Sequence, residues 1–234
     1  MRTNFLNGVF CVPKDGARDR MVLDARPPNG LEQAEDRWIR SLASTHQLLH
    51  FFLEEGETVA LFAEDLREFY HAFRVGGQRL KRNALAMAVR PSEVRHLRCF
   101  EPWMSGEDIL YPSLATMAMG DCNAVSYGQA SHLGVILQSG ALDLSSFITL
   151  TGRPGRHRLV AGLMIDGLVL LQRLLPGQAP HPTESSLAIA VIREVFYGVK
   201  ERLSMVRVPE TSGALNWAER LDLRDPVSLD AFPW

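Results

Sequence analysis

Residues 158–171 read RLVAGLMIDGLVLL, and this stretch decides how the rest of the sequence is interpreted. Two apolar runs flank Asp166-Gly167, and an Asp-Gly pair between such runs is a strong signal for a β-hairpin turn. A carboxylate at the tip of an apolar hairpin is costly to bury unless an ion pair or a metal compensates for it. Asp166 is therefore interpreted either as a type I′ turn residue or as part of a site.

A second acid ends another apolar run. Residues 58–65, TVALFAED, predict a short buried strand that stops at Asp65. If the two strands are neighbours in one sheet, the carboxylates of Asp65 and Asp166 converge on a site that can hold Mg²⁺ with oxygen ligands. Two-metal phosphoryl chemistry needs that arrangement. The alternative is that Asp65 caps a helix and that Asp166 only makes a type I′ turn.

The remaining pattern predicts an α+β protein. Residues 8–26 alternate in strand fashion about a turn and predict a hairpin. Helical spacing predicts helices over 31–55, 123–142 and 185–203, the second with small residues on one face. The strands and helices do not follow a regular βαβ alternation, so α+β is favoured over α/β.

Composition excludes several classes of protein. A hydrophobic content of 46% and a net charge of −2 indicate a globular chain that is neither disordered nor coated in basic charge. No apolar run reaches the length of a membrane span, so no membrane partner is expected. The three cysteines form no C-x-x-C pair, which favours an intracellular location in the cytoplasm or nucleus. The seven histidines show no metal spacing, so each is expected to be structural or solvent-facing.

Basic residues are concentrated between positions 74 and 98, where seven of them stand against the single acid Glu93. Such a stripe either lines a phosphate-binding groove or forms a solvated helix face. Its members are Arg74, Arg79, Lys81, Arg82, Arg90, Arg95 and Arg98.

Four motifs in order resemble the reverse transcriptase family. Residues 10–29, FCVPKDGARDRMVLDARPPN, resemble the fingers hairpin, with Lys14, Arg20, Asp24, Arg26 and Asn29 at its pattern positions. DLREFYHAFRV, from Asp65, resembles the first palm motif. MAMGDCNAVSYGQASH resembles the next palm motif, and LMIDGLVLL resembles the hairpin usually written Y-x-D-D.

The resemblance implies a role for each matching residue. Asp65 and Asp166 would be the catalytic metal ligands for Mg²⁺ or Mn²⁺. Lys14 and Arg20 would contact the phosphates of a deoxynucleoside triphosphate, and Tyr70 would screen the sugar 2′ position. Met119, Gly120 and Gln129 would complete the substrate-binding set. The partners implied are an RNA or DNA template-primer and deoxynucleoside triphosphates, while the sequence indicates no oligomeric state.

The resemblance also implies a domain plan: fingers-like residues 1–60, a palm-like domain with inserted loops at 61–208, and a short tail or thumb remnant at 209–234. The expected fold is α+β, with an antiparallel palm sheet packed on helices and a fingers hairpin. Three positions depart from the family pattern, because Met164 replaces the tyrosine, Gly167 the second aspartate and Ala118 a proline. Three functions stay open: RNA-directed DNA synthesis, an inactive retroelement remnant that keeps the fold and binds nucleic acid, and an unrelated binding domain.

Overall fold

The computed structural model describes residues 6–66, 68–178, 188 and 191–192. The chain forms two compact units. Unit 1 contains residues 6–34 and 70–124, and unit 2 contains the other described residues. The expected segments 1–60 and 61–208 therefore each contain parts of both units. The expected tail, 209–234, and nearly all of the expected helix 185–203 lie outside the described residues.

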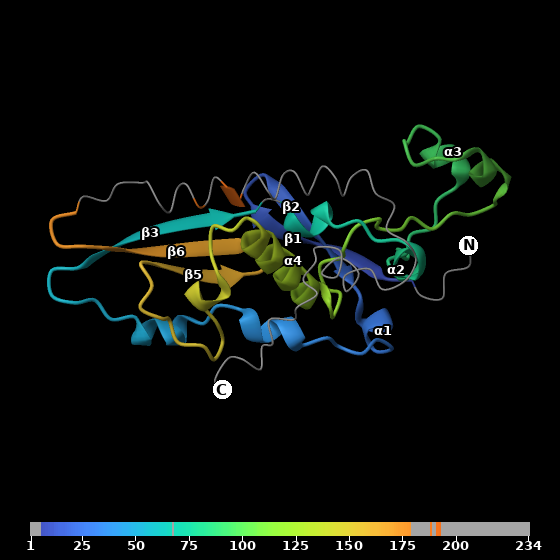
Figure 1. The fold of residues 1–234 in the computed structure, drawn as a ribbon. Helices are drawn as coiled ribbons and strands as arrows, with labels where there is room; N and C mark the ends of the chain where they lie inside the picture. Colours follow the sequence, from blue (N-terminus) through green and yellow to red (C-terminus); the bar gives the residue numbers. More distant parts are fainter. Residues whose placement is uncertain (1–5, 67, 179–187, 189–190, 193–234) are drawn as a thin grey trace. The chain divides into compact units, whose positions relative to one another are not determined.

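Unit 2 is built on a four-stranded sheet in the order β3-β6-β5-β4 (Figure 1). Its strands are β3 (Thr58–Asp65), β4 (Phe147–Ile148), β5 (Leu159–Met164) and β6 (Gly167–Leu174). β6 pairs antiparallel with both β3 and β5, whereas the short β4 runs parallel to β5. The expected strand over 58–65 and the expected hairpin over 158–171 are both confirmed, and so is the α+β class at this coarse level.

One face of this sheet is covered by helix α4 (Ala124–Gln138), which confirms the helix expected at 123–142. Leu133 and Ile136 of α4 belong to a buried apolar cluster with residues of β5 and β6. The strand residues in the cluster alternate along the chain, because successive side chains point to opposite faces of a sheet. They are Ala161, Leu163, Leu168 and Leu170.

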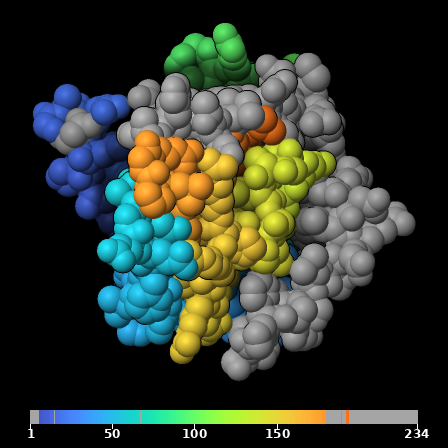
Figure 2. Space-filling model, turned by 60° about the vertical axis from the view of Figure 1, so that its left-hand side comes forward, coloured from blue at the N-terminus to red at the C-terminus, as the bar shows by residue number. Residues whose placement is uncertain are grey.

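The opposite face of the sheet is only partly covered. Phe51 packs there against Val160 and Leu171. Toward β3 the face is open, and the side chain of Leu61 is 64% exposed. In Figure 2 the cyan and orange segments that hold β3 and β6 lie side by side at the surface. Asp65 lies on this open face with Leu61, because the two residues are four positions apart along β3 and every second side chain of a strand points to the same face.

The prediction of a helix over residues 31–55 is wrong. The structure has two 3-10 helices there, η1 (Arg37–Ser41) and η2 (Thr45–His50). Tertiary hydrogen bonds replace the helical ones, because the Ala43 N–H donates to the Leu163 carbonyl of β5 at 2.8 Å and the Arg40 carbonyl accepts from the Leu150 N–H at 3.2 Å. The segment thus follows the sheet instead of coiling into one helix. A further 3-10 helix, η5 (Leu144–Ser146), precedes β4.

Unit 1 begins with the expected hairpin, β1 (Gly8–Asp15) paired with β2 (Arg18–Asp24). Short helices follow: α1 (Arg26–Asn29), α2 (Gly77–Arg82), α3 (Pro91–Val94) and the 3-10 helix η4 (Pro102–Gly106). A last 3-10 helix, η3 (Phe69–Ala72), lies where the chain passes from unit 2 to unit 1. A β-bridge between Val89 and Leu110 closes the segment that holds α3 and η4.

A tight backbone approach in unit 1 requires glycine at position 120. Gly120 has a φ of +106°, and a Cβ built on it would lie 2.6 Å from the carbonyl oxygen of Leu23. Leu23 is itself part of a buried cluster with Ala25, Leu85 and Ala118. Residue 120 therefore closes against the end of β2 only because it has no side chain.

We expect Gly120→Ala to lower the free energy of unfolding by about 2–4 kcal/mol, from a strained φ together with overpacking against backbone. Gly140→Ala is the matched control, because Gly140 also has a positive φ, +69°, but nothing lies within 4 Å of its virtual Cβ. That variant should lose only about 1–2 kcal/mol. Urea unfolding measures both, and equal losses would contradict the close approach at Leu23.

Candidate functional site

The two predicted acids lie at the same end of neighbouring strands in the unit 2 sheet, because Asp65 is the last residue of β3 and Asp166 immediately precedes β6. In the β3–β6 pairing, Asp65 lies opposite Gly167, the residue after Asp166. The Leu66 N–H donates to the carbonyl oxygen of Asp166 at 3.0 Å. The side chain of Asp65 is exposed and that of Asp166 is half-buried. The strands β3 and β6 are therefore neighbours in one sheet, as the metal hypothesis requires, and the metal site itself stays a prediction.

The alternative role of Asp65 as a helix cap is not what the structure shows. Asp65 is the last residue of β3, and the next helical residues are those of the 3-10 helix η3, which begins at Phe69. Glu68, beside it, has a positive φ of 52°. The acid therefore belongs to the strand end.

The hairpin turn differs from the expected one. The last β5–β6 pair is Met164 with Gly167, so the two loop residues are Ile165 and Asp166. The loop has a positive φ at its first position only, Ile165 at 59°, as a type II′ turn does. Asp166 thus remains in the turn, but Gly167 is the first residue of β6 and not a turn glycine.

Helix α4 holds this turn from the covered face of the sheet. Gln129 is fully buried, and its side-chain oxygen accepts a hydrogen bond from the Ile165 N–H at 2.8 Å. Its side-chain nitrogen donates to the carbonyl oxygens of Ser41 at 3.1 Å and Leu163 at 3.4 Å. The structure therefore shows Gln129, a predicted substrate-binding residue, hydrogen-bonded to the backbone that carries Asp166.

His132 is a second α4 side chain at the turn. Its Nδ1 lies 2.7 Å from the carbonyl oxygen of Ile165. The ring is 2% exposed and lies 5.6 Å, centroid to centroid, from the ring of Phe69. Burial lowers the pKa of His132 to about 4, so the ring is neutral at physiological pH. The expectation that histidines have structural roles holds for this one.

The other predicted site residues lie in unit 1. Lys14 and Arg20 are exposed on the β1–β2 hairpin, where the pairing register shifts between Pro13 and Asp15. Tyr70 is half-buried in η3, and Met119 is exposed next to Gly120. The acids and Gln129 therefore form one group, in unit 2, and these five residues form another, in unit 1.

Asn29 joins the two unit 1 motifs. Its side-chain nitrogen donates to the carbonyl oxygen of Gly120 at 2.8 Å, and its side-chain oxygen accepts from the Cys122 N–H at 3.0 Å. An amide side chain that donates and accepts toward one loop fixes the orientation of that loop. The end of the fingers-like motif therefore positions the Met119-Gly120 motif.

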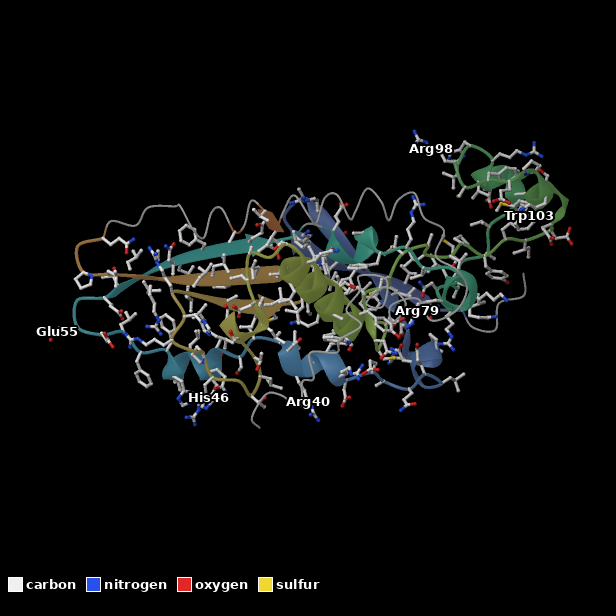
Figure 3. The ribbon with its side chains drawn as sticks, viewed as in Figure 1. Arg40, His46, Glu55, Arg79, Arg98 and Trp103 are labelled. Carbon is white, nitrogen blue, oxygen red and sulfur yellow. The ribbon has the colours of Figure 1, made fainter. Side chains whose placement is uncertain are left out.

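An acidic cluster in unit 1 contains Glu32, Asp121 and Cys122, whose ligand atoms lie within 4.8 Å of one another. Arg79, labelled in Figure 3, pairs with Glu32 at 2.9 Å and with Asp121 at 3.1 Å. Arg82 pairs with Glu32 at 3.2 Å. Burial raises the pKa values of Asp121 and Cys122, and a protonated thiol is a poor metal ligand. The guanidinium groups neutralise this cluster, which we interpret as structural.

These ion pairs also change the interpretation of the basic stripe. Arg79 and Arg82, both on α2, are paired with acids from other parts of unit 1. Arg98 lies on the segment of α3 and η4, well separated from Arg79 in Figure 3. The stripe is therefore divided between α2 and the segment of α3 and η4, and does not form the face of one helix.

Comparisons with family models and with curated protein sequences gave no match. The roles carried by the family resemblance therefore remain proposals. Within the described ranges, no helix combines the length and the apolar character that crossing a bilayer requires.

The lowered pKa of His132 predicts a loss of stability on acidification. The pKa rises from about 4 in the folded chain to its ordinary 6.5 on unfolding, so between these values only the unfolded chain is protonated. Stability is thus fully present above pH 6.5 and is lost as the pH falls toward 4. Between pH 7 and pH 5 the loss should be about 2 kcal/mol.

Urea unfolding at both pH values measures this effect. His132→Asn lacks the titrating group, so its free energy of unfolding should fall less between pH 7 and pH 5 than that of the unchanged chain. Equal falls in the two proteins would contradict the assignment.

Proposed function

We propose that this chain is a template-directed nucleotidyltransferase of the reverse transcriptase type, which adds deoxynucleotides to a primer with Mg²⁺ or Mn²⁺. One observation carries the proposal: the β3–β6 register places Asp65 opposite Gly167, with Asp166 in the adjoining turn. The order of the four motifs along the chain supports the same function, and this support does not depend on the strand register.

The donor set fits a hard divalent cation. Mg²⁺ in phosphoryl-transfer sites is usually bound by one or two carboxylates together with substrate phosphates. Asp65 is exposed and Asp166 is half-buried, so neither acid is enclosed in the core. Asp65 and Asp166 would hold the metal, which when bound supplies charge neutralisation of the phosphates and a lowered pKa for an attacking hydroxyl.

The surroundings of Asp65 are suited to a large substrate. The sheet face that bears Asp65 is open beside β3, where the side chains of Val59 and Leu61 are exposed. The opposite face is filled by α4 and offers no space for a polymer. A template-primer would therefore approach the acids from the open face.

The unit 1 residues would bind the nucleotide. Lys14 and Arg20 are exposed cations on a hairpin, and Arg20 can bind a phosphate through two N–H groups at once. Tyr70 would crowd the sugar 2′ position, because an aromatic ring is rigid. Met119 is exposed beside Gly120 and would contact the base or sugar, while Gly120 lets the loop close against the Leu23 carbonyl.

Gly167 favours a second candidate, an inactive chain that keeps the fold. Gly167 lies opposite Asp65, at the position where the family has a second aspartate. The site therefore has one carboxylate fewer. The two candidates differ in whether two acids suffice for metal-dependent extension. Primer extension on an RNA template with Mg²⁺ or Mn²⁺ distinguishes them.

Asp65→Asn should reduce primer extension by at least about 100-fold, because it removes a ligand of the metal that stabilises the transition state. Glu64→Gln is the matched control: it makes the same change of charge one residue away, on the face of β3 that α4 covers. The control should keep most of the activity. Extension that survives Asp65→Asn would refute the metal assignment.

Gly167→Asp should restore the missing carboxylate without a clash. The atom nearest to a Cβ at Gly167 is the Met164 carbonyl oxygen at 3.6 Å, an ordinary contact distance. The new side chain would face Asp65 at roughly 5 Å between Cβ atoms. Repulsion should lower the Tm in metal-free buffer, and Mg²⁺ should reverse that loss and increase extension.

Gly167→Asn is the uncharged control for this experiment, and its Tm should respond to Mg²⁺ no more than that of the unchanged chain. A Tm of the Gly167→Asp variant that responds to Mg²⁺ no more than the Tm of Gly167→Asn would count against a metal shared with residue 167.

A further inference from the structure

Ile165 has a backbone conformation that its side chain disfavours. Its φ of 59° lies in the left-handed region, where a β-branched residue is a real outlier and costs free energy. A type II′ turn normally has glycine at this position, but the nearest glycine, Gly167, lies two residues later. The hairpin alone therefore does not explain the turn, and something outside it must hold Ile165.

Two side chains of α4 hold both polar groups of Ile165. Gln129 accepts from its N–H at 2.8 Å, and the Nδ1 of His132 lies 2.7 Å from its carbonyl oxygen. Gln129 and His132 are three residues apart and so lie on one face of the helix. Together they hydrogen-bond to the peptide groups on both sides of the Ile165 Cα.

The chemistry of the contact determines the tautomer of His132. A carbonyl oxygen can only accept, so His132 must carry its proton on Nδ1 and donate it. The ring is 2% exposed and packs beside Phe69, so it cannot turn without opening the core. Gln129 is similarly restricted, since its nitrogen is used by Ser41 and Leu163.

We propose that His132 is a positioning residue for Asp166: by donating to the Ile165 carbonyl it keeps the Ile165-Asp166 turn in its strained conformation and so holds Asp166 next to the end of β3, where the Leu66 N–H donates to the Asp166 carbonyl. This inference rests on the proposed function, because Asp166 is taken as a metal ligand. The resemblance to the reverse transcriptase motifs implies no role for His132.

A pair of variants separates the donor from the volume of the side chain. Asn places its side-chain N–H the same number of bonds from Cβ as the Nδ1 of His, whereas Leu places a methyl group there. With the full chain, His132→Leu should lower the kcat of primer extension by about 10- to 100-fold, the effect of leaving one buried acceptor unpaired. The KM for deoxynucleotide should change little, and His132→Asn should restore kcat to within a few-fold.

Hydrogen exchange of the Ile165 amide, followed by NMR, reads the turn without any activity. His132→Leu should increase its exchange rate at least tenfold and shift its resonance, and His132→Asn should reverse both changes. Unchanged exchange in His132→Leu would overturn the inference, as would equal kcat values for the two variants. If the unchanged chain extends no primer, the proposed function fails and the exchange result alone decides whether His132 holds the turn.

Discussion

Pairing of β3 with β6 is the constraint on which the rest of unit 2 depends. Side chains alternate between the faces of a sheet, so a slip of one residue would move Asp65 to the face that α4 covers. The register is held by apolar packing, because Leu168 and Leu170 of β6 are buried in the cluster beneath α4. The position of Asp65 on the open face, next to the turn that bears Asp166, follows from burying these side chains.

Helix α4 has two functions in this arrangement. Its apolar side chains, such as Ile136, fill the core against the sheet. Its polar side chains Gln129 and His132 lie in the same buried surface, where an unpaired polar group is costly, and they are satisfied by the backbone of the turn that bears Asp166. Core packing and the geometry of the candidate site are therefore coupled through one helix.

Unit 1 shows how opposite charges distant in sequence determine the role of a basic segment. Glu32 and Asp121 lie far from Arg79 along the chain, yet both pair with it, and each of these side chains is less than a fifth exposed. In such a partly buried ion pair each charge depends on its partner, because removing one partner leaves the other charge in a poorly solvated place. The segment from Arg74 to Arg98 is accordingly divided between internal ion pairs and an outlying loop.

The sequence by itself determined the two hairpins, the strand ending at Asp65 and helix α4, because alternation, helical spacing and turn residues are local signals. Tertiary structure decided that residues 31–55 follow the sheet, that Ile165 rather than Gly167 takes the positive φ, and that Arg79 is paired. Each of these outcomes depends on partners distant in sequence, such as Leu163 for Ala43 and Gln129 for Ile165. Local propensity yields to them because a buried backbone group must find a hydrogen-bond partner, whichever part of the chain supplies it.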